Sequence, residues 1–237
     1  MAVRYRFTDR KGGVSAPPFS AFNLGSHVGD DPAAVSANRS RLVDQVGIGA
    51  IVWMDQVHSA TVQVVTAATA EPVAATDGMV TRTPGLGLAV LVADCVPVLA
   101  YDDAAGVIGV AHAGRNGAAA GIGAALIGVM VGQGADPARI TAILGPSVCG
   151  RCYEVPETMR DAVAQELPGS SSVTDRGTAA LDLPAGLEHQ LRAAGVTRVR
   201  RDPRCTLEDD TLFSHRRQAP TGRQAGVIWL EDADSRP

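Results

Sequence analysis

The sequence predicts strands and helices interleaved around a mixed β-sheet, in a fold of the α/β or α+β class. Apolar runs typical of strands alternate along the chain with helical patterns. Several expected strands are joined by turns too short for a parallel crossover, so antiparallel pairs must share the sheet. The chain has 237 residues, of which 46% are hydrophobic, and this is enough to bury one sizeable core. We therefore expect residues 1–237 to form a single domain.

The N-terminal half is expected to contain one helix among several strands. An acidic cap followed by proline at Asp30-Asp31-Pro32 favours a helix start, and Gly47 favours its end. Alternating or continuous apolar runs predict strands at 3–8, 51–54, 61–65, 79–81, 86–92, 97–101 and 106–111.

The C-terminal half repeats this pattern more loosely. The sequence Ala113–Gly117 is expected to open a helix of small residues that runs to about Val131. The remaining segments predict a strand at 140–144, a helix at 156–166, a Ser/Gly-rich loop at 168–175, a helix at 184–194 and a strand at 225–230.

Composition excludes some classes of function. The formal net charge is −4, which does not suit a nucleic-acid-binding surface. No N-terminal apolar stretch resembles a secretory signal, and no apolar run has membrane-spanning length, so we expect a cytoplasmic protein without membrane partners. In that compartment the four cysteines are expected as free thiols, ligands or nucleophiles. Cys149 and Cys152 lack a second pair at zinc-finger spacing and are expected as two loop thiols, and Cys205 as a structural thiol.

Three residues stand at the ends of expected strands, where loops converge. They are His58, Cys95 and His112. Two imidazoles and a thiolate suit zinc, and three protein ligands leave a fourth position open, as in catalytic sites. Taken singly, each residue is more often structural: a lone histidine after a strand usually serves as a hydrogen-bonded structural residue, and a lone buried cysteine behaves as a small hydrophobic residue.

Several short motifs, in a consistent order, give the sequence a family resemblance. They are Asn23–Asp30, Asp55–Ser59, Asp77–Thr81, Ala93–Pro97, Ala111–Arg115, Leu144–Ser147, Cys152–Val155, Ser214–Arg217 and Thr221–Gln224. Together they resemble the YfiH/laccase-domain family over nearly the whole chain, with a core of roughly residues 20–230.

The resemblance implies a single-domain fold layered α/β/β/α, related to the cysteine deamidase fold of bacterial toxins. It also implies a zinc site on His58, Cys95 and His112. Family members are described as purine nucleoside phosphorylases that also deaminate adenosine and cleave methylthioadenosine. Other descriptions are copper-dependent polyphenol oxidases and editing factors for peptidoglycan precursors.

Further residues have candidate roles beside the metal ligands. Asp94 is expected either to shuttle protons or to accept the free ring N–H of a ligand histidine. Arg115 is expected to bind phosphate at the N-terminus of the predicted helix, with the role of an ordinary surface or structural arginine as the alternative. The resemblance also suggests Asn23, His27 and Arg39 as substrate-binding residues. A loop-shaping role for Asn23 and His27, and a pairing role for Arg39, fit equally well.

The sequence leaves four functions to weigh. The first is a zinc enzyme acting on purine nucleosides and phosphate. The second is an amidase that edits muramyl-nucleotide precursors with the same zinc chemistry, or without metal through Cys95 as nucleophile and His112 as base. A copper polyphenol oxidase ranks below these, because a multicopper cluster needs many imidazoles and the chain has 5 histidines. A non-enzymatic metal-binding module is disfavoured by the three-ligand count.

Overall fold

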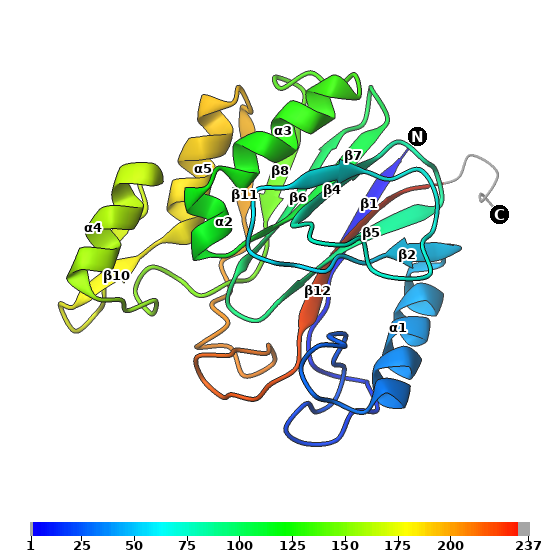
Figure 1. The fold of residues 1–237 in the computed structure, drawn as a ribbon, viewed down its shortest axis with the longest axis horizontal. Coiled ribbons are helices and arrows are strands. Elements are labelled where there is room, and N and C mark those ends of the chain that lie inside the picture. Colours follow the sequence, from blue (N-terminus) through cyan, green and yellow to red (C-terminus); the bar gives the residue numbers. More distant parts are fainter. Residues whose placement is uncertain (1, 232–237) are drawn as a thin grey trace.

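Two β-sheets packed face to face form the centre of the molecule (Figure 1). The computed structural model describes residues 2–231. The smaller sheet is ordered β1 (Val3–Phe7), β12 (Gln224–Leu230), β5 (Leu86–Val92) and β2 (Ala50–Val52). The larger sheet is ordered β11 (Arg198–Arg201), β8 (Thr141–Leu144), β6 (Val96–Asp102), β7 (Val107–Ala113), β4 (Gly78–Thr81) and β3 (Val62–Val64).

Both sheets are mixed, which confirms the fold class predicted from the short connections. Strands β6 and β7 form an antiparallel hairpin in which Pro97 pairs with His112. Parallel pairs occur in the same sheets, between β2 and β5, β3 and β4, and β8 and β11.

Helices cover the outer faces of the two sheets, so the layers run α/β/β/α (Figure 1). The helix α1 (Pro32–Val46) covers the smaller sheet. The larger sheet is covered by α2 (Arg115–Ala119), α3 (Ile122–Gly132) and α5 (Leu183–Ala193), with α4 (Glu157–Glu166) beside a small hairpin.

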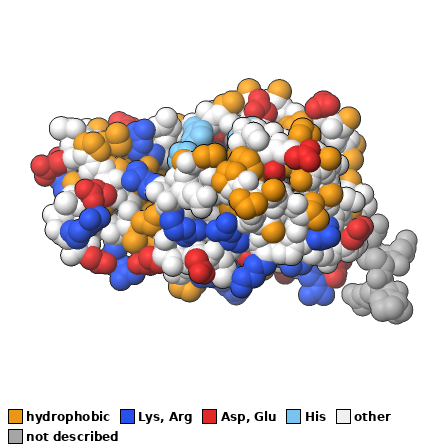
Figure 2. All heavy atoms as spheres, turned by 90° about the horizontal axis from the view of Figure 1, so that it is seen from below, with side chains coloured by type: hydrophobic (Ala, Val, Ile, Leu, Met, Phe, Trp, Pro, Cys, Tyr) orange, Lys and Arg blue, Asp and Glu red, His pale blue; other side chains and the backbone are white. Residues whose placement is uncertain are grey.

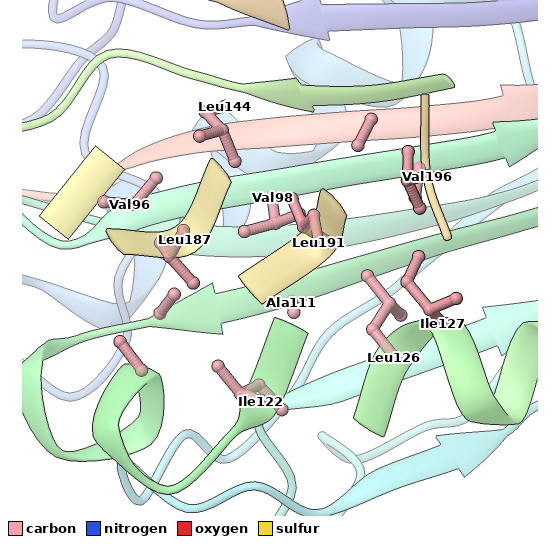
Figure 3. Packing of buried hydrophobic residues seen from close by; sticks show 14 of the residues in the cluster. Val96, Val98, Ala111, Ile122, Leu126, Ile127, Leu144, Leu187, Leu191 and Val196 are labelled. Carbon is pink, nitrogen blue, oxygen red and sulfur yellow. The ribbon is translucent and has the colours of Figure 1, made fainter. Parts of the chain in front are cut away.

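The continuous apolar run of β5 follows from burial on both faces. Leu88 and Val90 face the larger sheet, whereas Ala89 and Leu91 face α1. A separate apolar layer, which includes Leu126 and Leu191, fills the space between the larger sheet and its helices (Figure 3). Because each sheet is covered on both sides, the strand ends have fixed positions from which site residues can project.

The predicted N-terminal helix is confirmed at both ends. The Asp31 carboxylate accepts a hydrogen bond from the Ala33 N–H, and Pro32 occupies the first turn. Gly47 closes the helix with φ 68°, a left-handed conformation that glycine adopts without a steric cost.

Two predictions for the C-terminal half were wrong. The predicted helix from Ala113–Gly117 to Val131 is two helices, because Gly121 has φ 91° and separates α2 from α3. The predicted loop at 168–175 contains β9 (Ser171–Val173), which pairs with β10 (Ala179–Leu181). Its serines carry too weak an apolar pattern to signal a strand. No helix within residues 2–231 is long and apolar enough to cross a membrane.

Candidate metal centre and adjoining cavity

Three side chains from separate segments meet at one edge of the larger sheet. His58 lies in the loop between β2 and β3, Cys95 joins β5 to β6, and His112 lies in β7. One donor atom from each lies within 4.8 Å of the others, and the two imidazole centroids are 4.7 Å apart. The hairpin register explains part of this meeting, because the partner of His112 is Pro97, two residues after Cys95.

Asp77, at the start of β4, holds two of the three candidate ligands in place. Its buried carboxylate lies 2.9 Å from Nδ1 of His112 and accepts the N–H groups of Val57, His58 and Ser59. The Ser59 hydroxyl donates a further bond of 2.8 Å. A carboxylate on the outer nitrogen of a histidine fixes the ring and directs the other nitrogen toward a metal. Asp77 therefore makes the histidine contact that we had offered as one of two roles for Asp94.

The backbone around the centre is specialised for close approach. A Cβ at Gly114 would lie 2.6 Å from His58 Cδ2 and 3.0 Å from Cys95 Sγ, so only glycine fits there. His58 has φ 62°, which is uncommon for a residue with a side chain and occurs often at functional sites.

The surroundings of Cys95, His112 and Asp77 shift the pKa of each. Burial opposes ionisation of the Cys95 thiol, but hydrogen bonds from His112 and His58 and their charges lower its pKa to about 6. Burial likewise opposes protonation of His112, yet hydrogen bonds to Asp77 and Cys95 raise its pKa to about 9. In the same network, hydrogen bonds from His112 and Ser59 outweigh burial and lower the pKa of Asp77. The centre therefore favours a thiolate, which is the form that binds metals.

A cavity of about 370 Å³ opens beside the centre. Its apolar wall is formed by Leu91, Val92, Ala93, Val148, Tyr153 and Leu183. Its polar lining consists of the three candidate ligands with His27, Gln56, Asp94, Arg115, His215, Arg216 and Arg223. In the view from below, histidine side chains reach the surface with basic side chains close by (Figure 2).

Asp94 and Arg115, our candidate catalytic residues, both line this cavity. Asp94 has φ 94°, and its two carboxylate oxygens accept hydrogen bonds from the Thr206 hydroxyl at 2.7 Å and the Arg216 N–H at 2.8 Å. Arg115 is half-buried and, within residues 2–231, its guanidinium makes no hydrogen bond or ion pair. Asp94 is thus already engaged, whereas Arg115 has its donors available.

The three candidate substrate-binding residues occupy different surroundings. His27 lines the cavity, and its pKa is lowered by burial and by the charges of Arg223 and Arg39. Asn23 is fully buried and bonds to the backbone of Gly25 and Arg223, so it shapes its loop. Arg39 donates to the Leu24 carbonyl and lies 4.2 Å from the Trp53 ring centroid, in a neighbouring depression.

Sequence reasoning missed several residues of this region. Asp77 belongs to one of the short motifs, but no role was predicted for it from the sequence. It stands directly before a buried strand, just as the candidate ligands stand at strand ends. Gln56 was also missed. Its side chain exchanges two hydrogen bonds of 2.8 Å with the backbone of Leu91 and so fixes the His58 loop against β5. Arg216 and Arg223 reach the cavity from a long irregular segment, whose position in space no local pattern predicts.

The donor set fits a transition metal. Two imidazoles and a low-pKa thiol match the ligand types of zinc, and Asp77 occupies the outer nitrogen of His112 as metal-bound histidines require. The three donors face a cavity rather than a fourth protein ligand, so a position remains for substrate or water.

Comparison with known proteins places the chain in a family. Residues 4–231 match the sequence family described as multi-copper polyphenol oxidoreductase laccase. A Mycobacterium tuberculosis protein named purine nucleoside phosphorylase is 53% identical over 231 residues, covering 97% of this chain and 92% of the relative. A Corynebacterium glutamicum protein of the same name is 54% identical over 232 residues, covering 96% and 94%.

Solved structures agree with this placement. The Bacillus licheniformis hypothetical protein YfiH has a TM-score of 0.90 at 33% identity, with 97% of this chain and 93% of that chain covered. YlmD from Geobacillus stearothermophilus has a TM-score of 0.90 at 34% identity, with 97% and 92% covered. The chain therefore belongs to the multi-copper polyphenol oxidoreductase laccase family and shares the fold of the YfiH and YlmD proteins.

Proposed function

We propose that this protein is a zinc-dependent purine nucleoside phosphorylase that also accepts methylthioadenosine and deaminates adenosine. The observation that carries the proposal is an electropositive cavity with one apolar wall beside a three-donor metal centre. Relatives that are more than half identical to this chain are named purine nucleoside phosphorylase, which supports the phosphorylase part of the proposal.

Phosphate is expected to bind near Arg115 and Arg223. Both guanidiniums line the cavity, and Asp94 is the only carboxylate among the lining residues in the described part of the chain. Because Thr206 and Arg216 already engage Asp94, its charge is partly satisfied and repels an anion less. An unpaired arginine can form charge-assisted hydrogen bonds with phosphate oxygens.

The purine ring is expected against the apolar wall. Leu91 and Val148 offer branched apolar surface, and Tyr153 offers a flat ring whose centroid lies 4.3 Å from the Arg216 guanidinium. In phosphorolysis a phosphate oxygen forms a bond to C1′, the bond from C1′ to N9 breaks, and the purine leaves with its electron pair and takes up a proton. The chain's contribution is to hold the anion and the ring in line for this displacement.

Zinc, when bound, would supply a Lewis acid that polarises an oxygen and lowers the pKa of water. The residues that would hold it are His58, Cys95 and His112, with Asp77 orienting the ring of His112. Zinc fits this set better than a multicopper cluster, because a cluster consumes many imidazoles and the chain has 5 histidines.

Deamination of adenosine needs a group that moves protons as water adds to C6 and ammonia leaves. Asp94 borders the cavity next to Cys95 and is our candidate for this role. To take up or release a proton, the Asp94 carboxylate must loosen the hydrogen bond that it accepts from Thr206 or from Arg216. Because only deamination uses this proton transfer, Asp94→Asn is expected to reduce deamination more than phosphorolysis.

The test is product analysis. Purified zinc-loaded protein is incubated with adenosine, inosine or methylthioadenosine, with and without phosphate, and the products are separated by chromatography. Free base that requires phosphate, and that is lost in Cys95→Ala, is the expected result. The matched control is His189→Ala, an exposed histidine of α5 outside the cavity. Turnover equal to that of Cys95→Ala would overturn the proposal.

A second function is favoured by one specific arrangement. Cys95, His112 and Asp77 form a chain of thiol, imidazole and carboxylate, as in metal-free thiol amidases. A muramyl-nucleotide precursor would be the substrate of such an amidase. Cleavage of that substrate that survives exhaustive chelation would establish this alternative, and loss of all activity on chelation would count against it.

A further inference from the structure

A second group of donor side chains lies outside the cavity, on two loops. Cys149 and Cys152 belong to the loop after β8, whereas Cys205 and Glu208 belong to the loop after β11. One donor atom from each of these four residues lies within 4.8 Å of the others. We call this group the thiol cluster.

The backbone holds each pair of donors on a closed turn. The N–H groups of Cys152 and Tyr153 both donate to the Cys149 carbonyl, at 3.0 Å each. In the second loop the N–H of Glu208 donates to the Cys205 carbonyl at 3.2 Å. Each pair therefore has the same three-residue spacing, which points two side chains to one side of a turn.

The two turns are joined directly to each other. Ser147 and Cys205 form a parallel bridge, and the Thr206 N–H donates to the Ser147 carbonyl at 3.1 Å. The Cys149 N–H points at the Cys205 sulfur, 3.4 Å away. In the sequence, Cys149 and Cys152 have no second ligand pair at zinc-finger spacing. In the structure, the loop that begins 56 residues after Cys149, at Cys205, supplies that pair.

We propose that the thiol cluster is a second, structural metal site that binds a thiophilic divalent cation such as zinc through three thiolates and the Glu208 carboxylate. Four protein donors close a tetrahedral shell, which is the pattern of structural zinc sites. The Arg151 guanidinium lies 3.7 Å from Glu208 and offsets the negative charge of the ligands. Binding releases the thiol protons to solvent and changes no oxidation state.

The environment is suited to such a site. Cys205 is 4% exposed, the other two thiols are half-buried, and Glu208 is exposed, so an ion can enter from the Glu208 side. A surface depression lined by Arg151, Cys152 and Leu207 leads to the same point. A disulfide between two of the thiols would leave the third thiol and the carboxylate without a role.

A metal here would stabilise the wall of the cavity. The first loop carries Val148 and Tyr153 to that wall, and the Val148 N–H donates to the Asp94 carbonyl at 3.0 Å. The second loop carries Thr206, whose hydroxyl binds the Asp94 carboxylate. One ion that joins the loops would therefore fix two of the three contacts that hold Asp94.

The test uses the full chain, reduced and stripped of metal, with Co²⁺ as the spectroscopic probe. The variant His58→Ala/His112→Ala removes the first centre. A failure of the second-site proposal can therefore be told apart from a failure of the proposed function. We expect this variant to bind one equivalent of Co²⁺, at the thiol cluster, with an intense near-ultraviolet thiolate-to-cobalt band. Adding Cys149→Ser and Cys205→Ser is expected to abolish that band.

Two further measurements keep the test decisive if a cysteine variant does not fold. Metal analysis of the reduced wild-type protein is expected to give one equivalent more zinc than that of Cys152→Ser, a half-buried and milder substitution. Peptide mapping of protein purified under reducing conditions is expected to find the three thiols free. Absence of Co²⁺ binding in the double histidine variant, or a Cys149–Cys152 disulfide in that sample, would overturn the proposal.

Discussion

The two donor clusters of this protein are built in opposite ways. The first centre places His58, Cys95 and His112 beside an open cavity, on or next to strands of the packed sheets. The thiol cluster places four donors on two surface loops outside the sheets, beside a surface depression lined by Cys152. Three donors facing an empty space suit a reaction, whereas four donors facing one another suit a structural link.

The difference also concerns what holds each cluster together. The first centre is positioned by the β6–β7 register and by the Asp77 carboxylate, so its geometry does not depend on an ion. The thiol cluster relies on loop turns and one short bridge between them. Removing metal from the first centre should therefore stop the reaction, whereas removing it from the thiol cluster should lower stability.

The largest expected effect tests the first half of that comparison. We expect His112→Ala to reduce phosphorolysis on the order of a thousandfold, since metal polarisation contributes several kcal/mol and each 1.4 kcal/mol corresponds to roughly tenfold in rate. The measurement is kcat/KM with saturating phosphate, and His189→Ala is the matched control. A variant that retains wild-type turnover would show that the first centre is not the site of reaction.

Thiol reactivity should distinguish Cys95 of the first centre from Cys205 of the thiol cluster at neutral pH. In metal-free protein the pKa of Cys95 is lowered to about 6, so its thiolate forms above that pH. His112, whose pKa is raised to about 9, stays protonated up to that pH and pairs with the thiolate. Burial raises the pKa of Cys205, which stays a thiol at pH 7.

The measurement is alkylation of each cysteine against pH, followed by peptide mass spectrometry. Labelling of Cys95 should rise through pH 6, whereas labelling of Cys205 should rise only in alkaline solution. Equal labelling of the two residues at pH 7 would remove the electrostatic distinction between Cys95 and Cys205.

Asp77→Asn should weaken metal binding at the first centre by about 10–100-fold, as is typical when the hydrogen-bond partner of a ligand histidine is changed. Asparagine preserves the size of the side chain but loses the charge that faces His112. Competition with a chromophoric chelator measures the affinity. The thiol cluster provides the internal reference, because its affinity should stay the same; a fall at both sites would indicate general unfolding.

The sequence predicted the sheets and the first centre well, for the same physical reason. Buried strands such as Leu86–Val92 have to be apolar on both faces, and the chemistry then stands out where the run ends, at Cys95. The N-terminal helix was predictable because its signals, Asp31, Pro32 and Gly47, are local. The relation to toxin deamidases and the role of Asp94 stay predictions.

Features that depend on distant contacts were not predictable. The β11 strand is rich in arginine because it lies at the edge of the larger sheet, so its sequence lacks an apolar pattern. The thiol cluster escaped detection because its two pairs are far apart in sequence and one donor is a glutamate. Arg223 reaches the cavity through a loop whose position depends on its contact with Asn23.

The smallest expected effect concerns phosphate, which should bind in the cavity beside the first centre and not at the thiol cluster. Arg115→Gln removes a guanidinium that has no other partner within residues 2–231, so we expect the KM for phosphate to rise roughly tenfold, the equivalent of one charge-assisted hydrogen bond. The value of kcat should change less, because the metal ligands stay in place. Arg82→Gln, an exposed arginine outside both clusters, is the matched control. If Arg115→Gln left the KM for phosphate unchanged while adenosine binding weakened, Arg115 would belong to the nucleoside side of the cavity, and Arg223 would be the residue to test for the anion.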